Sequence, residues 1–173
     1  MRNADEEKAV YSAYLTRGML HDAHDWSVDT RILLVIEDET GVAGNLRWKG
    51  MMPFDSRSVF PQLFASTRAS FLFRNLLQTP MVKPDPLPNW VSVAFASRHD
   101  IKLLQDDPSE FEKRLPRNLG YIAMSGVGFN PSRTQAVFYI DHFCGLCGGG
   151  RYVLMEKVNG KWAIRDEHWT WIS

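Results

Sequence analysis

Two cysteines separated by two residues, Cys144 and Cys147, are the first residues whose type and spacing could do chemistry. Such a pair can form a disulfide, a redox couple or half of a zinc site, or it can remain as two free thiols. A thioredoxin-type couple needs a helix N-terminus to lower the thiol pKa, and this pair lies between two predicted strands. A structural zinc site needs four ligands, and His142 supplies only a third. The spacing favours a local disulfide that fixes the shape of the loop, and a metal or redox role for residues 142–147 stays an alternative.

The last predicted strand carries two titratable residues, Asp166 and His168, that could act as an acid–base pair. Residues two apart in a strand point to the same face, so these side chains are neighbours. Acid–base catalysis needs such groups in a pocket, and His142 on an earlier strand is the third candidate. The simpler interpretation is a hydrogen-bonded or exposed pair. The chain has no G-x-S-x-G, H-E-x-x-H or Walker motif, so no residue is assigned a catalytic role.

Tryptophans gather near the C-terminus, where Trp162, Trp169 and Trp171 share one predicted strand. The two-residue period of a strand predicts that Trp169 and Trp171 share a face and that Trp162 lies on the opposite face. Such rings are usually part of the core. An exposed pair would instead offer a surface to a partner or a sugar, which makes Trp169 and Trp171 the candidate ligand-contact residues.

Three further motifs have a chemical and a structural interpretation. Gly148–Gly150 could bring backbone amides close to an anion, but it leads into a strand, and we interpret it as a turn or bulge with positive φ. The segment His21–Asp25 has two histidines three apart that could share a metal, and its polarity favours a surface loop. His99 and Asp100 are interpreted as a turn at a strand end.

Hydrophobic patterns predict three helices followed, for the most part, by strands. The expected helices span residues 6–18, 66–77 and 108–115, and the expected strands span residues 31–37, 91–95, 121–129, 134–143, 152–158 and 161–172. In the second helix, four apolar residues form the predicted buried side: Phe64, Phe71, Leu72 and Leu76.

Two turns organise the C-terminal strands into a meander. Asn159-Gly160 is a strong hairpin signal, because a type I′ turn needs positive φ at both central residues. Asn130 and Pro131 suit the preceding turn, because asparagine bonds its own backbone and proline cannot sit in a central ladder. The order of elements predicts one α+β domain over residues 1–173, with a curved antiparallel sheet packed by N-terminal and central helices. A cystatin-like or nuclear-transport-factor-like cone is one such arrangement, and G-K-W-A-I resembles the last hairpin of those domains.

Composition and charge limit the classes of partner. The chain has 20 basic and 20 acidic residues in 173, so its formal net charge is zero. A neutral chain without a Lys/Arg-rich run argues against a nucleic-acid partner held by bulk charge. No apolar run is long enough for a transmembrane helix. The polar N-terminus is not a signal peptide, although an export signal removed earlier is compatible with it.

Several C-terminal motifs resemble one family. They are V-G-F-N-x-x-x-T-Q-A at 127–136, C-G-x-C-G-G-G-x-Y-V-L at 144–154, E-K-x-x-G-K-W at 156–162 and W-I-S at 171–173. Together they resemble an uncharacterised family of bacterial exported or lipoprotein-like proteins, and the similarity extends over most of the chain. The resemblance implies an envelope location but no activity and no catalytic residues. In that family the cysteine pair is often one residue wider or is replaced, which argues against an obligatory chemical role for Cys144 and Cys147.

These observations lead us to expect a non-enzymatic binding or interaction module of the bacterial cell envelope. Its partner would be an unknown protein or small molecule, and no cofactor or metal is assigned. A periplasmic or envelope location is favoured, with the cytoplasm as the alternative. The alternative function is a small enzyme with an acid–base pocket on the concave face of the sheet, formed by Asp166, His168 or His142.

Overall fold

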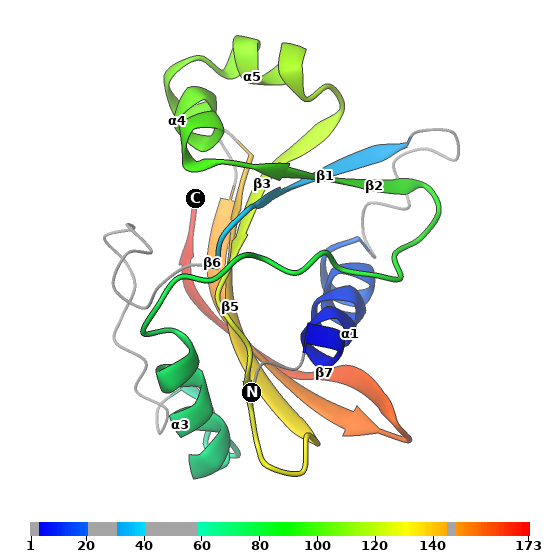
Figure 1. Cartoon of the computed structure of the whole chain (residues 1–173), viewed down its shortest axis with the longest axis vertical. Helices are drawn as coiled ribbons and strands as arrows, with labels where there is room; N and C mark the ends of the chain where they lie inside the picture. Colours follow the sequence, from blue (N-terminus) through cyan, green and yellow to red (C-terminus); the bar gives the residue numbers. More distant parts are fainter. Residues whose placement is uncertain (1–3, 21–30, 41–58, 145–147) are drawn as a thin grey trace.

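The computed structural model describes residues 4–20, 31–40, 59–144 and 148–173, and a seven-stranded sheet runs through it (Figure 1). The strands lie in the order β2-β1-β3-β5-β6-β7, and β4 also pairs with β5. The strands are β1 (Ile32–Glu37), β2 (Val91–Ala96), β3 (Asn118–Met124), β4 (Gly128–Phe129), β5 (Gln135–Phe143), β6 (Gly148–Val158) and β7 (Lys161–Ile172). The helices are α1 (Ala4–Tyr14), its π-helical continuation η1 (Leu15–Met19), α3 (Ala65–Arg74), α4 (Arg98–Asp106) and α5 (Pro108–Arg114).

The sheet is mixed, with an antiparallel and a parallel part. Strands β3, β5, β6 and β7 form the predicted antiparallel series, whereas β1 is parallel to both β2 and β3. The connections explain this difference, because α3 lies between β1 and β2, and α4 and α5 lie between β2 and β3. Such long crossovers return the chain in the same direction. The predicted α+β class with a curved sheet is confirmed, but its antiparallel arrangement does not extend to β1 and β2.

Both predicted turns are confirmed. Asn159 and Gly160 have φ values of 51° and 78°, as a type I′ turn requires. The Asn130 side chain accepts hydrogen bonds from the backbone N–H groups of Thr134 and Gln135, at 2.9 and 3.0 Å. The chain therefore turns at the two places where local chemistry specifies it.

One helix, α4, was not predicted. Ser97 and Asp100 form a capping box at its start, with the Asp100 backbone N–H donating to Ser97 Oγ and the Ser97 backbone N–H donating to Asp100 Oδ2. The interpretation of His99 and Asp100 as a turn at a strand end is therefore wrong. The spacing Ser-x-x-Asp is the sequence signal that identifies this helix start.

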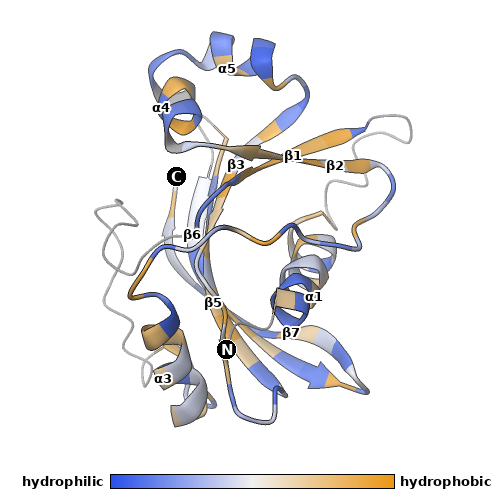
Figure 2. Ribbon diagram, in the orientation of Figure 1, coloured by the Kyte–Doolittle hydropathy of each residue, from blue (hydrophilic) through white to orange (hydrophobic). Residues whose placement is uncertain are grey.

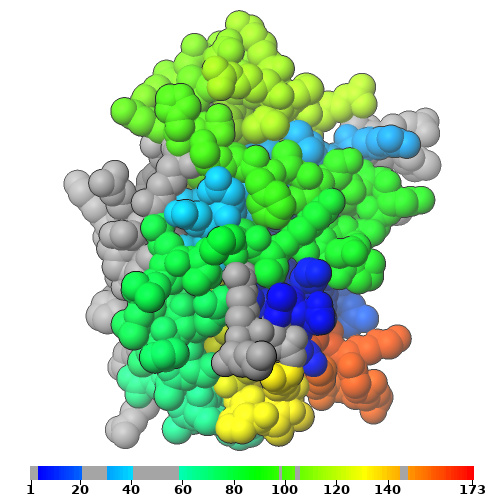
Figure 3. Space-filling view, viewed as in Figure 1, coloured from blue at the N-terminus to red at the C-terminus, as the bar shows by residue number. Residues whose placement is uncertain are grey.

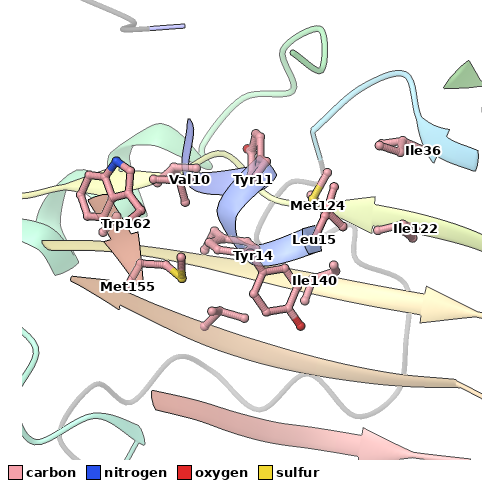
Figure 4. Close-up of a cluster of buried hydrophobic side chains, with 14 of the residues drawn as sticks. Val10, Tyr11, Tyr14, Leu15, Ile36, Ile122, Met124, Ile140, Met155 and Trp162 are labelled. Carbon is pink, nitrogen blue, oxygen red and sulfur yellow. The ribbon is translucent and has the colours of Figure 1, made fainter. Parts of the chain in front are cut away.

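The concave side of the sheet, which we call the α1 face, curves around α1 (Figure 1). Tyr11 and Tyr14 of α1 pack edge-on against Phe138 of β5, with ring centroids 5.6 and 5.3 Å apart. Figure 4 shows this core extending from Trp162 at one end to Ile36 at the other. Burial of these large side chains fixes α1 against the middle of the sheet.

The opposite side, which we call the α3 face, is covered at one end by α3 and at the other by α4 and α5 (Figure 1). Phe71 of α3 packs edge-on against Tyr152, with ring centroids 6.1 Å apart. At the other end, Phe111 of α5 packs in a cluster with Tyr121. Asp141 of β5 lies on this face between the two apolar clusters, opposite Gly150 of β6.

Helix α3 is held in place by polar contacts at both ends. Thr67 Oγ1 donates to Gln135 Oε1 at 3.0 Å near the start of the helix. At its end, Asn75 donates to the Gly126 carbonyl at 2.9 Å and accepts from the Gly126 N–H at 2.7 Å. The Arg74 guanidinium pairs with the buried Glu7 carboxylate of α1 at 3.1 Å. These contacts join α3 to the sheet and to α1.

The predicted buried side of α3 is only partly correct. Phe71 is buried, but Phe64, Leu72 and Leu76 are exposed. The reason is that α3 meets the sheet along a narrow stripe, where Gly128 allows the backbone of Phe71 to approach closely. No helix in the described ranges is long and apolar enough to cross a membrane.

Asn75→Ala tests the polar attachment of α3. It leaves the buried N–H and carbonyl of Gly126 without their Asn75 partner, and unpaired buried groups cost about 1–3 kcal/mol each. We expect the free energy of unfolding, measured in urea, to fall by about 2–4 kcal/mol. Ser66→Ala, at an exposed position of the same helix, is the control and should change it by less than about 0.5 kcal/mol. Equal stability of the two variants would contradict this account of Asn75.

Candidate functional site

Gly148–Gly150 form the first residues of strand β6. The glycines with positive φ among the described residues are Gly120 and Gly160, so the interpretation of Gly148–Gly150 as a positive-φ turn is wrong. A Cβ atom on Gly149 would lie 2.5 Å from the Trp169 ring, and a Cβ on Gly150 would overlap Tyr139, Asp141 and Trp171. The glycines are required because side chains from neighbouring strands lie directly against their Cα atoms.

Polar side chains near these glycines form two clusters, and the first lies on the α3 face around Asp141. Asp141 is only 2% exposed, and its Oδ1 accepts hydrogen bonds from the Tyr139 hydroxyl at 3.0 Å and from Trp171 Nε1 at 2.9 Å. Thr170 Oγ1 lies 2.9 Å from the Tyr139 hydroxyl and donates to the Gly150 carbonyl at 2.9 Å. The cluster therefore joins β5, β6 and β7 through polar side chains.

Burial governs the ionisation of this cluster. It raises the pKa of Asp141 from 3.8 to about 6, although the hydrogen bonds from Trp171 and Tyr139 act in the opposite direction. Burial and the nearby Asp141 carboxylate also raise the pKa of Tyr139, and they raise that of Tyr152 to about 12. Asp141 is thus the group of this cluster that exchanges a proton near neutral pH. An acidic residue within an otherwise apolar strand was the sequence signal for it, because a buried polar residue is more informative than a buried apolar one.

The second cluster lies on the α1 face around Arg151. Arg151 Nε lies 2.7 Å from Glu167 Oε1 and donates to the Tyr14 hydroxyl, which donates in turn to Glu167 Oε1 at 3.2 Å. The guanidinium lies over the Trp169 ring, 4.1 Å from its centroid. The arrangement combines an ion pair with a cation–π contact, and it fixes the orientation of Arg151.

Trp169 and Trp171 lie on opposite faces, contrary to the prediction from strand period. Trp169 pairs with Arg151 and Trp171 with Gly150, so Thr170 is an extra residue on β7. A β-bulge of this kind reverses the alternation of side chains. Trp169 is 45% exposed and keeps its role as a candidate ligand-contact residue, whereas Trp171 donates to buried Asp141 and packs on Phe143.

The predicted acid–base residues lie on two faces of the sheet. Asp166 and His168 share the α3 face as predicted, where Asp166 accepts a hydrogen bond from Gln62 Nε2 at 2.9 Å. His142 lies on the α1 face, where its Nε2 is 2.6 Å from the Leu119 carbonyl oxygen. Burial lowers the pKa of His142. Of the three candidates for an acid–base pocket on the concave face, His142 alone lies on that face, and Asp166 and His168 lie on the opposite face.

The remaining candidates lie at or beyond the limits of the described residues. Cys144 follows β5 and is not a free cysteine, but Cys147 lies outside the described residues, so their pairing stays a prediction. The segment His21–Asp25 also lies outside them. Within residues 4–20, 31–40, 59–144 and 148–173, no group of three His, Cys, Asp or Glu side chains could hold a metal ion.

Comparison with models of known protein families gave no match to this chain, and searches of curated proteins and of solved structures gave none either. The resemblance to bacterial exported or lipoprotein-like proteins and the cystatin-like or nuclear-transport-factor-like arrangement therefore stay predictions. Function has to be argued from the chain's own residues.

Asp141→Asn tests the buried carboxyl. The folded pKa of about 6 exceeds the ordinary 3.8, so stability from protonated Asp141 is present at low pH and is lost as pH rises from about 4 to about 6. We expect the loss to reach about 3 kcal/mol. Asparagine keeps the Oδ1 acceptor and cannot ionise. The free energy of unfolding of the variant, measured in urea at several pH values, should therefore rise relative to that of the unmodified protein over this pH range. Parallel pH profiles for the two proteins would contradict the raised pKa.

Gly150→Ala tests the steric requirement in β6. The new Cβ meets three enclosed polar atoms, whereas the Cβ of Gly149→Ala meets Trp169, which is partly exposed and can turn away. Overpacking typically costs about 1–3 kcal/mol. We expect Gly150→Ala to lower the free energy of unfolding by at least about 2 kcal/mol and to lower it more than Gly149→Ala does. The opposite order would show that the Trp169 contact is the tighter one.

Proposed function

We propose that the protein is a non-enzymatic binding module that contacts a partner protein through the outer surface of α3 and the residues just after it. The observation that carries this proposal is a concentration of exposed apolar side chains. Five of the nine large apolar side chains that the described residues leave exposed lie in α3 or directly beside it: Phe64, Leu72, Phe73, Leu76 and Leu77. Large apolar side chains that are exposed together in one segment are typical of interaction sites.

The figures locate this surface on the outside of the molecule. Figure 3 shows the α3 segment at the lower left of the space-filling view. Figure 2 shows apolar and polar turns side by side on this helix. Phe73 is 79% exposed and Leu77 is 74% exposed, so these two side chains have little contact with the rest of the described chain. They are the strongest candidates for direct contact with a partner.

Arg68 gives the surface a charge. It lies one helical turn from both Phe64 and Leu72, so the three residues follow one side of α3. Its Nε has no hydrogen-bond partner, and Arg68 forms no ion pair with the described residues. The Nε atom is itself buried, so a carboxylate from a partner would pair with the charge of the guanidinium rather than with Nε. The complementary surface is therefore an apolar groove with an acidic residue at its edge, since α3 is itself convex.

The exposed side chains are not the result of a loosely attached helix. Asn75, Thr67 and Arg74 hold α3 by hydrogen bonds and an ion pair, and Phe71 fixes it to the sheet. A firmly positioned helix presents its outer side chains in one arrangement, which lowers the entropy cost of binding. The firm attachment of α3 therefore favours an interaction surface, rather than incomplete packing of the core, as the reason for the exposed side chains.

The enzyme alternative has weaker support. Its candidate residues Asp166, His168 and His142 lie on two faces of the sheet, and Asp141, the buried acid with the raised pKa, is enclosed by its hydrogen-bond partners. An envelope location remains part of our proposal. It rests on the sequence resemblance and on the Cys144–Cys147 pair, because disulfides persist in oxidising compartments.

A photocrosslinking residue placed at Phe73 in cells that naturally produce the protein tests the proposal. We expect it to capture a partner whose affinity for the purified protein is then measured by titration calorimetry. Phe73→Asp and Leu77→Asp place a charge in the apolar contact, and each should weaken binding at least about tenfold, since truncating a contact at the centre of an interface costs about 2 kcal/mol or more.

Val158→Asp is the matched control, because Val158 is comparably exposed but lies on the β6–β7 hairpin. Its affinity should equal that of the unmodified protein. Equal loss of affinity in the control, or none in the α3 variants, would refute the proposed surface. A crosslink between two copies of this chain would show that the surface binds a second copy and not a different partner protein.

A further inference from the structure

Several contacts on the α1 face hold the side chain of Arg151 in one orientation. Its Nε is engaged by Glu167 and Tyr14, and its planar guanidinium lies over the rings of Trp169 and Tyr14, at 4.1 and 5.5 Å from their centroids. The side chain is only 13% exposed. These contacts fix the guanidinium plane before any ligand arrives, and such preorganisation lowers the cost of binding.

The contacts leave one edge of the guanidinium available. Among the described residues, the side-chain hydrogen bond to Tyr14 and the ion pair with Glu167 both use Nε of Arg151, and no side-chain hydrogen bond uses either Nη nitrogen. The two Nη groups form the fork that binds a carboxylate through two parallel hydrogen bonds. Arg151 therefore resembles a half-occupied site, in which Glu167 holds the Nε side and the Nη side lacks a partner in the described chain.

An apolar platform lies beside Arg151 on the same face of the sheet. Trp169 rests against Gly149, where a side chain would displace its ring, and it is 45% exposed. Ile172 pairs with Gly149 across the β6–β7 ladder on the same face and is also exposed. Charge and apolar surface thus meet at one place on the α1 face, and a ligand that matches both has an anionic end and an apolar body.

The surrounding titratable groups favour an added negative charge. Burial raises the pKa of Tyr14, so its hydroxyl stays protonated and links Arg151 to Glu167. Burial lowers the pKa of His142, and the Arg151 charge lowers it further, so the imidazole is neutral at pH 7. Within the described part of the chain, Glu167 is the carboxylate paired with Arg151, and it occupies the Nε side rather than the Nη edge.

We propose that Arg151 binds the carboxylate of a small organic acid, whose aromatic or branched apolar body lies on Trp169 and Ile172. Tyr14 and Glu167 are positioning residues that hold the guanidinium. This site lies on the α1 face, whereas the partner surface proposed above lies on α3, so either proposal can fail without the other. The ligand class follows from the planar fork, which matches a carboxylate, and from the ring beside it.

Benzoate is the probe, and the indole N–H of Trp169 and the amide N–H of Gly149 report its binding in two-dimensional NMR spectra of the full chain. We expect a saturable shift of both signals with benzoate, and none with benzyl alcohol, which has the ring but no charge. Arg151→Lys keeps the charge but loses the fork, so its affinity should fall at least about tenfold. Arg165→Lys, on the exposed part of β7, is the matched control and should bind benzoate normally.

Trp169→Leu provides a second test that leaves Arg151 and Glu167 in place, and it should also weaken binding, with the Gly149 signal as reporter. Unchanged spectra elsewhere in the molecule would show that each variant is folded. The proposal is overturned if benzoate produces no saturable shift, or if Arg151→Lys binds it as well as the unmodified protein. It is equally overturned if benzyl alcohol or inorganic phosphate binds as tightly as benzoate, because each lacks one of the two required features.

Discussion

The absence of side chains at Gly149 and Gly150 is the constraint on which the C-terminal half of the sheet depends. The two residues point to opposite faces of β6, and each is covered by a tryptophan from β7. On one face the space admits the Trp171 indole next to Asp141, and on the other it admits the Trp169 ring next to Arg151. Because one backbone segment serves both faces, an enclosed polar cluster and an open cationic one form back to back across a single sheet.

The β-bulges of β7 make this arrangement possible. Thr170 is the extra residue that sends Trp169 and Trp171 to different faces, and a second register shift near Arg165 places Trp162 on the same face as Trp169. Without Thr170 as an extra residue, both C-terminal tryptophans would compete for the space on one side of Gly149 and Gly150. The bulge thus changes the side-chain alternation of β7 at the place where Gly149 and Gly150 each leave room for one large ring.

The accuracy of prediction from sequence follows the range of the interactions involved. The turn at Asn159-Gly160, strand β5 with its two apolar faces and the positions of α1, α3 and α5 depend on neighbouring residues, and they were predicted. The mixed sheet, the reversal at Thr170 and the exposure of Leu72 depend on which segments meet in three dimensions, and a periodic pattern does not contain that information. Helix α4 is different, since its Ser97-x-x-Asp100 capping box is a local signal that the sequence contains. Of the candidate site residues, Trp169 is exposed and stays a candidate for ligand contact, while Asp141 and Arg151 emerge only when β5, β6 and β7 are aligned.

The two polar clusters differ in what surrounds them, and this difference bears on function. Asp141 is enclosed, its Oδ1 accepts from both Tyr139 and Trp171, and its burial makes the folded state more stable when the carboxyl is protonated. Arg151 lies beside an exposed ring and has hydrogen-bonding capacity that the described residues do not use. A buried carboxyl with a raised pKa is often taken as a sign of catalysis, but structural networks shift pKa values as well. Here the buried carboxyl of Asp141 joins three strands, so the capacity to recognise a ligand is better sought at Arg151, an oriented charge beside the exposed ring of Trp169.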